Sequence, residues 1–169
     1  MQATTGASID QEAMAAWQSF LRAHAVLIRT LERELQAARG LPLAEYDVLV
    51  QLDGVPEGRL RMAQLADQVL LSRSGLTRLV ERMEASGLVR REVCPSDARG
   101  AFAAITEEGR RQLLSSAEIH MRSLRDHFVG PLDSSQIGQL QEACDRLLEG
   151  SPEEPVRCPS TDQPGAEEV

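Results

Sequence analysis

Residues 72–78 place arginine and hydroxyl side chains at spacings suited to hydrogen bonding with a nucleic acid. Arginine can bond two atoms of a guanine base at once, and hydroxyl groups bond to bases or phosphates. Further arginines and an aspartate follow in residues 90–99. The candidate residues for contact with double-stranded DNA are Ser72, Arg73, Ser74, Thr77, Arg78, Arg90, Arg91, Asp97 and Arg99.

The arginines of this region stand out against an acidic chain. The formal net charge is −8, yet residues 59–111 hold ten Arg against seven Asp or Glu, a local balance of +3. Arginines that merely pair with neighbouring glutamates on a solvated helix face are the usual explanation of a charge run. Here they continue through a predicted helix, strand and turn, which favours a nucleic acid partner.

Two short helices are predicted to position the first group of arginines. The first is indicated by four apolar residues at helical spacing, Met62, Leu65, Ala66 and Val69. Ser72 is a good N-cap for a second helix that ends at Gly87. A buried stripe of Leu76, Leu79, Val80 and Met83 leaves the Arg73 and Arg78 side chains on the opposite face. This is a helix-turn-helix pattern, whose second helix enters a DNA groove.

A small wing is predicted after the second helix. Residues 88–93 have the composition of a strand, residues 95–100 that of a turn, and residues 101–105 that of a returning strand. The wing would carry Arg90, Arg91, Asp97 and Arg99.

Longer helices are predicted on both sides of this core. The first begins at the capping box of Ser8 and Gln11 and runs to about Arg39, and Pro42 opens the next. Thr106 caps a long helix, and Asp133 with Gln136 starts a last one. The apolar stripe of the Thr106 helix is expected at Leu113, Leu114, Ala117, Met121, Leu124 and Phe128, and that of the last helix at Ile137, Leu140, Cys144, Leu147 and Leu148.

These flanking helices display more apolar surface than a small winged core can bury, so we expect a homodimer. The predicted fold class is mainly α with a small β-wing, a winged helix-turn-helix flanked by long N- and C-terminal dimerisation helices. The expected divisions are residues 8–41 (dimerisation helix), 42–106 (DNA-binding core), 107–149 (dimerisation helices) and 150–169 (a disordered acidic, Pro-rich tail).

The run from Leu43 to Leu148 resembles the MarR family of winged-helix transcription regulators. The matching motifs are MAQLADQV, LSRSGLTRLVERMEASGLVRRE, DARG and ITEEGRRQL, and the likeness extends over about residues 9–149. The resemblance implies a dimer, a recognition helix in the major groove, and Arg99 of the wing in the minor groove. It also implies that Asp97 holds an arginine such as Arg91 across the wing, although Asp97 is equally a turn former.

The same resemblance implies a small effector, commonly an aromatic or phenolic acid, between the dimerisation helices and the winged core. Trp17, His24 and Tyr46 are the candidate effector contacts. For Trp17 and His24 the alternative is packing in an interface or core. The expected function is therefore a repressor on a pseudo-palindromic operator, released when the effector binds.

Two alternatives remain open. Cys94 lies beside Arg90 and Arg91, where cationic neighbours could activate its thiol for redox sensing, whereas Cys144 falls in an apolar stripe and Cys158 in the tail. A helical dimer that holds a protein partner without binding DNA is the other alternative.

Several classes of function are not expected. The sequence lacks a zinc-ligand spacing, a phosphate-binding loop and a nucleophile elbow, so we expect no enzyme, cofactor or metal site. It also lacks a signal peptide pattern and an apolar run of about 20 residues, so we expect a cytoplasmic protein without a membrane partner.

Overall fold

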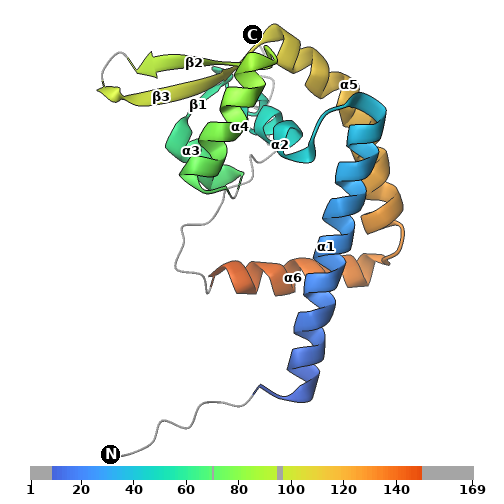
Figure 1. The fold of residues 1–169 in the computed structure, drawn as a ribbon. Helices are drawn as coiled ribbons and strands as arrows, with labels where there is room; N and C mark the ends of the chain where they lie inside the picture. The colour runs from blue at the N-terminus through green and yellow to red at the C-terminus, as the bar shows by residue number, and fades with distance from the viewer. Residues whose placement is uncertain (1–8, 70, 95–96, 150–169) are drawn as a thin grey trace, which may run out of the picture.

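The computed structural model describes residues 9–69, 71–94 and 97–149 (Figure 1). The side chains of residues 93, 94 and 97–100 lie outside this description. The elements, in order, are α1 (Gln11–Arg39), α2 (Leu43–Asp53), β1 (Arg59–Arg61), α3 (Met62–Gln68), α4 (Arg73–Ala85), β2 (Val89–Cys94), β3 (Asp97–Ile105), α5 (Glu107–Leu124), η1 (Arg125–Val129) and α6 (Ser134–Glu149). The predicted fold class, mainly α with a small β-wing, is confirmed.

The wing is a three-stranded antiparallel sheet in the order β1-β3-β2. β2 and β3 pair from Val89 opposite Ile105 to Cys94 opposite Asp97, with an irregularity in register between Val93 and Cys94. The expected turn over residues 95–100 is therefore too long, because β3 begins at Asp97 and continues the ladder that pairs with β2. The connection at residues 95–96 lies outside the described residues.

The core of the winged lobe is built from leucine and valine side chains of α2, α3 and α4. The predicted stripe of α4 is confirmed, since Leu76, Leu79, Val80 and Met83 are all buried. Figure 1 shows α4 beside the sheet, with α2 between the winged lobe and the long helices. α4 is thus held by apolar packing on one side and exposed on the other.

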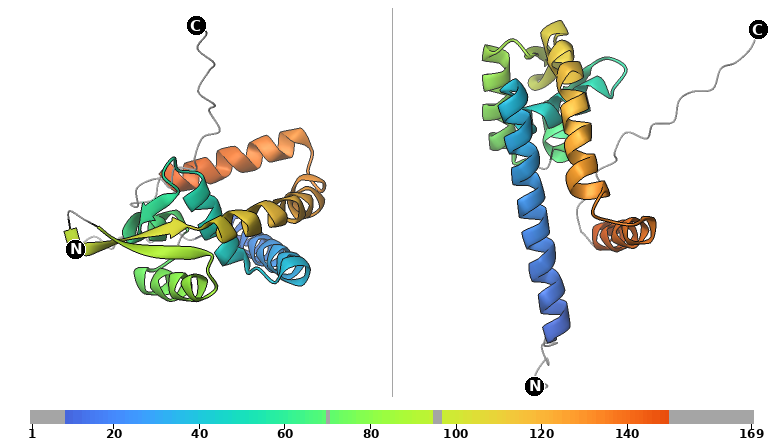
Figure 2. Two further views of the ribbon diagram at one scale, coloured as in Figure 1. Left: turned by 90° about the horizontal axis from the view of Figure 1, so that it is seen from above. Right: turned by 90° about the vertical axis from the view of Figure 1, so that its right-hand side faces the viewer.

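α1 and α5 run side by side below the winged lobe (Figure 2). Leu31 and Leu35 of α1 and Leu113 of α5 belong to the same buried core. The buried face of α5 continues through Ser116 and Ser123, whose small side chains suit close contact between helices.

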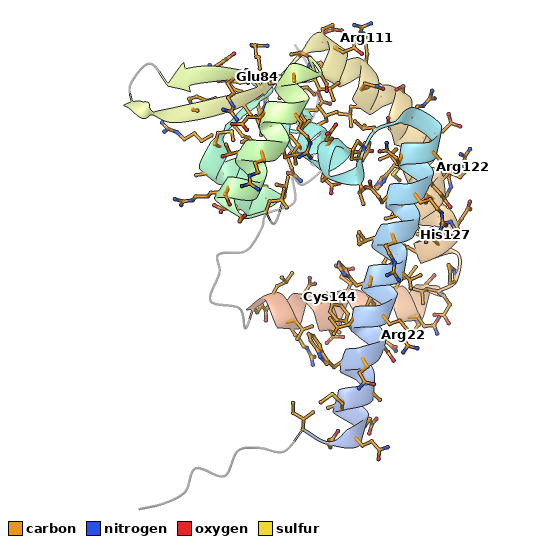
Figure 3. All side chains as sticks on the ribbon, in the orientation of Figure 1. Arg22, Glu84, Arg111, Arg122, His127 and Cys144 are labelled. Atoms are coloured by element: carbon orange, nitrogen blue, oxygen red, sulfur yellow. The ribbon has the colours of Figure 1, made fainter. Side chains whose placement is uncertain are left out.

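In the single chain, the expected apolar stripe of α5 is only partly buried. Leu114 is 72% exposed and Met121 52% exposed in the single chain, so both lie outside the packed face. The α5 helix ends in a π-helical turn, and there His127 bonds to Glu34 of α1 at 2.8 Å. This bond links η1 to α1, and His127 is labelled in Figure 3.

The predicted helix starts are confirmed at Ser72, Thr106 and Asp133, but not at Ser8. Ser72 and Thr106 each accept a backbone hydrogen bond as N-caps, and Asp133 and Gln136 bond to each other's backbone N–H at 2.9 Å. The first helix instead begins at Gln11 with Asp10 as its N-cap, because the Asp10 carboxylate accepts from Ala13 N at 2.7 Å. Ser8 lies outside the described residues.

α6 runs nearly perpendicular to α1 (Figure 1) and packs loosely against its own chain. Leu147 and Leu148 of the predicted stripe are exposed, at 67% and 60%. In the part of the chain that the structure describes, no helix has both the length and the apolar character needed to span a bilayer.

Candidate DNA-binding interface

The N-terminal turn of α4 presents the hydroxyl groups that the sequence singled out. Ser72 Oγ accepts from Gly75 N at 3.1 Å and lies 3.3 Å from Ser74 Oγ. Thr77 Oγ1 donates to the Arg73 carbonyl at 2.8 Å, so its remaining lone pairs face outward as acceptors. All three side chains are exposed, so the structure brings them together on one accessible face.

Arg73 and Arg78 are exposed on the same helix, and neither has an ion-pair partner among the described residues. Their positive charges are therefore not neutralised within the described part of the chain. A helix N-terminus adds a partial positive charge and free N–H groups in the same place. The arrangement can attract phosphate and offer guanidinium groups to base edges.

Arg90 is held on the sheet. Its guanidinium group bonds to Glu92 at 2.9 Å, and Glu92 also accepts from Arg59 at 3.0 Å. The hydrogen bonds from Arg59 and then Arg90 lower the pKa of Glu92, so this carboxylate stays ionised between its two partners. Arg90 remains exposed beside this pair, and its positive charge is partly compensated.

Arg91, also on β2, turns the other way and contacts α4. Its Nη2 donates to the Thr77 carbonyl at 3.1 Å and lies 3.4 Å from Glu81 Oε1. Its own backbone N–H donates to Glu84 Oε1 at 3.1 Å. The side chains of Asp97, Arg99 and Cys94 lie outside the described residues, so the suggested Asp97–Arg91 contact and the redox role of Cys94 stay predictions.

Strand β1 adds two arginines that the sequence reasoning did not include. The guanidinium carbons of Arg59 and Arg61 lie 5.2 and 5.3 Å from the centre of the Phe102 ring, within the range of cation–π attraction. The alternation of Arg59, Leu60 and Arg61 was an available signal, since it is the period of a strand with one face buried.

A second group of polar residues lies between α2 and α5. The rings of Tyr46 and His120 are 4.6 Å apart between centroids. His120 Nδ1 and Ser116 Oγ are buried and have no hydrogen-bond partner among the described residues. Burial lowers the pKa of His120 and raises that of Tyr46. The site therefore holds neutral groups that can form hydrogen bonds, and two of their polar atoms are buried without a partner among the described residues.

The other two candidate effector residues, Trp17 and His24, lie on α1 and not beside Tyr46 of α2. Trp17 is 55% exposed, and its ring neighbour is Phe20, which in turn neighbours His24. Trp17 lies about 21 Å along the helix from Leu31, where α1 enters the core. Within one subunit, the described ring contacts of Trp17 and His24 therefore do not reach Tyr46, whereas His120, which was not among the candidate effector residues, does.

Among the described residues, no three His, Cys, Asp or Glu side chains are grouped as a metal site would require. Cys144 is a half-buried free thiol on α6.

Comparison with known proteins gives one consistent result. The sequence pattern of the MarR family matches residues 39–100. The crystal structure of Sco3205, a MarR family transcriptional regulator from Streptomyces coelicolor in complex with DNA, is 36% identical and covers 88% of this chain and 92% of its own, with a TM-score of 0.82. AbsC, a MarR family transcriptional regulator from the same organism, is 35% identical, covers 85% of this chain and 97% of its own, and has a TM-score of 0.79.

A sequence relative agrees with these structures. The HTH-type transcriptional regulator MhqR of Bacillus subtilis (strain 168) is 29% identical over 108 residues, which is 64% of this chain and 72% of MhqR.

Proposed function

Since this chain belongs to the MarR family and is a DNA-binding transcription regulator, we propose that it acts as a homodimeric repressor that a small effector releases from its operator. The observation that carries the proposal is the exposed face of α4, where Arg73 and Arg78 stand beside Ser74 and Thr77 without an ion-pair partner among the described residues.

The reading mode follows from this face. α4 enters the major groove, where Arg73 or Arg78 bonds guanine and the hydroxyl groups of Ser72, Ser74 and Thr77 bond to bases or phosphates. Arg99 of the wing reaches the adjacent minor groove. A two-fold dimer presents two such helices about 34 Å apart, which matches half-sites one helical turn apart in a pseudo-palindrome.

Separate segments of the chain would bind DNA and form the dimer. Residues 42–106 form the DNA-binding core, and residues 8–41 and 107–149 supply the dimerisation helices. Exposed apolar side chains on α1, α5 and α6 support this assignment, because a water-soluble monomer seldom exposes so many together.

The effector site we propose lies between α2 and α5, around Tyr46, His120 and Ser116. A small aromatic or phenolic acid suits this place, because its ring packs against Tyr46 while its oxygens bond to the Ser116 hydroxyl and the His120 ring. Binding there shifts α5 against the winged core and changes the spacing of the two α4 helices, so the dimer leaves its operator.

The test compares Arg73→Ala and Arg78→Ala with Arg122→Ala, an exposed arginine on α5 (Figure 3). The probe is a duplex that the wild-type protein selects from a random-sequence pool. We expect each α4 variant to bind it about 10- to 100-fold more weakly, as loss of a guanine contact or a phosphate contact requires, and the Arg122 variant to bind normally. Equal binding by all four proteins would refute the proposed reading face.

Repression and release are tested on the same duplex placed across a promoter. We expect the protein to lower transcription in vitro and a panel of benzoic and hydroxybenzoic acids to include one that restores it. Ser116→Ala should weaken that response while leaving DNA binding intact. Activation of the promoter, or release that is unaffected by the substitution, would contradict the proposal.

A further inference from the structure

The side chain of Arg91 joins β2 of the wing to the recognition helix at three positions of α4. Its Nη2 donates to the Thr77 carbonyl at 3.1 Å and lies 3.4 Å from the Glu81 carboxylate, and its Nε lies 3.8 Å from the Glu84 carboxylate. Glu84 also accepts from the backbone N–H of Arg91 at 3.1 Å. Glu84 lies at the end of α4 nearest the sheet (Figure 3).

The three contacted positions share one flank of α4. Residues 77, 81 and 84 are separated by four and three positions, so they form a row along the helix. One turn closer to the N-terminus, the same row carries Arg73, and Thr77 belongs both to the row and to the reading face. A tie along this row therefore controls how α4 is rotated about its own axis and how far the reading face stands from the wing.

Apolar packing alone fixes this rotation less tightly. The buried stripe of Leu76, Leu79, Val80 and Met83 holds the opposite side of α4 in the core, but hydrophobic contact is not directional. A planar guanidinium group that bonds a carbonyl and faces two carboxylates is directional. The arginine thus supplies the orientational restraint that the stripe does not.

The charge of Arg91 is also compensated, which distinguishes it from Arg73 and Arg78. It lies between two carboxylates, its side chain is 32% exposed, and its Nε is buried. A guanidinium group in this setting offers phosphate little free charge. Glu81 and Glu84, in turn, are prevented from repelling DNA beside the reading face.

We propose that Arg91, with Glu81 and Glu84, is a positioning residue that sets the orientation of α4 for operator discrimination and is not itself a phosphate or base contact. This inference rests on the DNA-binding role proposed above. We call the three residues and the Thr77 carbonyl the α4 clamp.

One double substitution should change DNA affinity in opposite directions under the clamp proposal and under simple electrostatics. In Glu81→Gln/Glu84→Gln, two negative charges leave the DNA-facing side, so charge alone predicts tighter binding to any duplex. The clamp predicts about tenfold weaker binding to the duplex selected by the wild-type protein, with binding to a scrambled duplex of equal length unchanged or stronger. Retained discrimination between the two duplexes in this variant would overturn the proposal.

Arg91→Ala and Arg91→Lys test the arginine itself. We expect both to lose about tenfold in affinity for the selected duplex, the loss of one hydrogen bond to a charged group, with an unchanged slope of log affinity against log salt. A phosphate contact predicts that the slope falls by about one in Arg91→Ala and that Arg91→Lys binds almost normally. That pattern would overturn the proposal. Arg122→Ala is the matched control, and thermal melting verifies that each variant is folded.

Hydrogen exchange of the free protein gives a readout that does not depend on DNA. Loss of the clamp should speed exchange of the α4 amides from Thr77 to Glu84, and exchange as slow as in the wild type would overturn the proposal. If the wild-type protein selects no sequence at all, the proposed function fails, while the clamp is still judged by this exchange.

Discussion

The arginines of the winged lobe differ in what their guanidinium groups contact. Arg73 and Arg78 on α4 carry charge that no described carboxylate neutralises, whereas Arg59 and Arg90 share Glu92 and Arg91 faces α4. An uncompensated arginine contributes to the salt dependence of DNA binding, and a compensated one orders the protein. Residue type alone does not separate the two groups, because the carboxylates that the fold places beside each arginine decide the role.

His120 gives a prediction at the same scale. Burial lowers its pKa from the ordinary value of 6.5, so the folded chain holds it neutral where the unfolded chain begins to protonate it. The stabilisation is complete above pH 6.5 and is lost as the pH falls toward the folded-state pKa. We expect the free energy of unfolding, measured with urea, to decrease as the pH is lowered from 7.5 to 5.5. The decrease should be smaller in His120→Gln than in the wild type.

The ionisation of Asp47 changes the free energy of unfolding with pH in the opposite direction. The variant and the wild type are therefore compared by the slope of that free energy against pH. Desolvation and then the charge of Glu32 raise the pKa of Asp47 to about 6, so its contribution is present at low pH and lost as the pH rises through about 6. Because much of Asp47 remains exposed, we expect its contribution to be the weaker. His24→Gln, which removes an exposed histidine without an ion-pair partner among the described residues, is the control, and equal slopes for His120→Gln and the wild type would contradict the assignment.

The junction between the winged lobe and α5 depends on Gly109. A Cβ atom there would collide with the Leu88 carbonyl oxygen and lie 2.9 Å from Ile105 Cγ1 and 3.1 Å from Leu49 Cδ2. The backbone of α5 therefore passes directly against the start of β2. We expect Gly109→Ala to lower the free energy of unfolding by about 1–3 kcal/mol, as overpacking does, in spite of the better helix propensity of alanine.

Gly138 on α6 is the matched control for that measurement. A Cβ atom there would meet nothing within 4 Å, and the residue is helical, so Gly138→Ala should be neutral or stabilise by up to about 1 kcal/mol. Urea unfolding of both variants tests the pair. A Gly109→Ala protein as stable as the wild type would show that α5 is not packed so closely on the lobe.

Elements that carry local signals were predictable, and those fixed by distant partners were not. Ser72, Thr106 and the Asp133–Gln136 pair mark helix starts by chemistry within four residues, and all three are confirmed. Gly87 has a positive φ of 73°, which its position after α4 suggested. The three-residue strand β1 was missed, because its alternating pattern is a short local signal and the strand is completed by pairing with β3 more than forty residues away.

The site shows the same limit. The α4 reading face follows from a helical period, and its exposure is confirmed. The face of α5 that packs within the chain did not follow from the apolar stripe, because two serines, Ser116 and Ser123, occupy it while Leu114 is exposed. Polarity misleads where helices approach closely, since a small side chain packs there better than a large apolar one. The Tyr46–His120 contact could not be predicted from the sequence, because the packed face of α5 was not identified there.

At the scale of the whole molecule, apolar surface and charge are separated. The exposed apolar side chains lie mostly on α1, α5 and α6, at the end of the molecule away from the sheet, whereas Arg73 and Arg78, whose charges no described carboxylate neutralises, lie on α4. A dimer formed through the long helices would bury the first set and leave both α4 helices free. We therefore expect DNA binding to depend on association, since one α4 helix would read only half of a palindrome.

Leu147 and Leu148 on α6 test this dependence. Both are largely exposed, and α6 packs loosely against its own chain, so Leu147→Glu/Leu148→Glu should leave each subunit folded. In a dimer interface each buried leucine contributes about 2 kcal/mol, and a glutamate there adds the cost of desolvating a charge. We expect sedimentation to give a particle of 18.5 kDa in place of one of twice that mass. Binding to the selected duplex should fall at least 100-fold, while Ser135→Glu, on the opposite face of α6, should leave both mass and binding unchanged. A variant that keeps the mass of the wild type would exclude this face of α6 from the interface, and a monomer that binds the duplex normally would show that reading does not require two subunits.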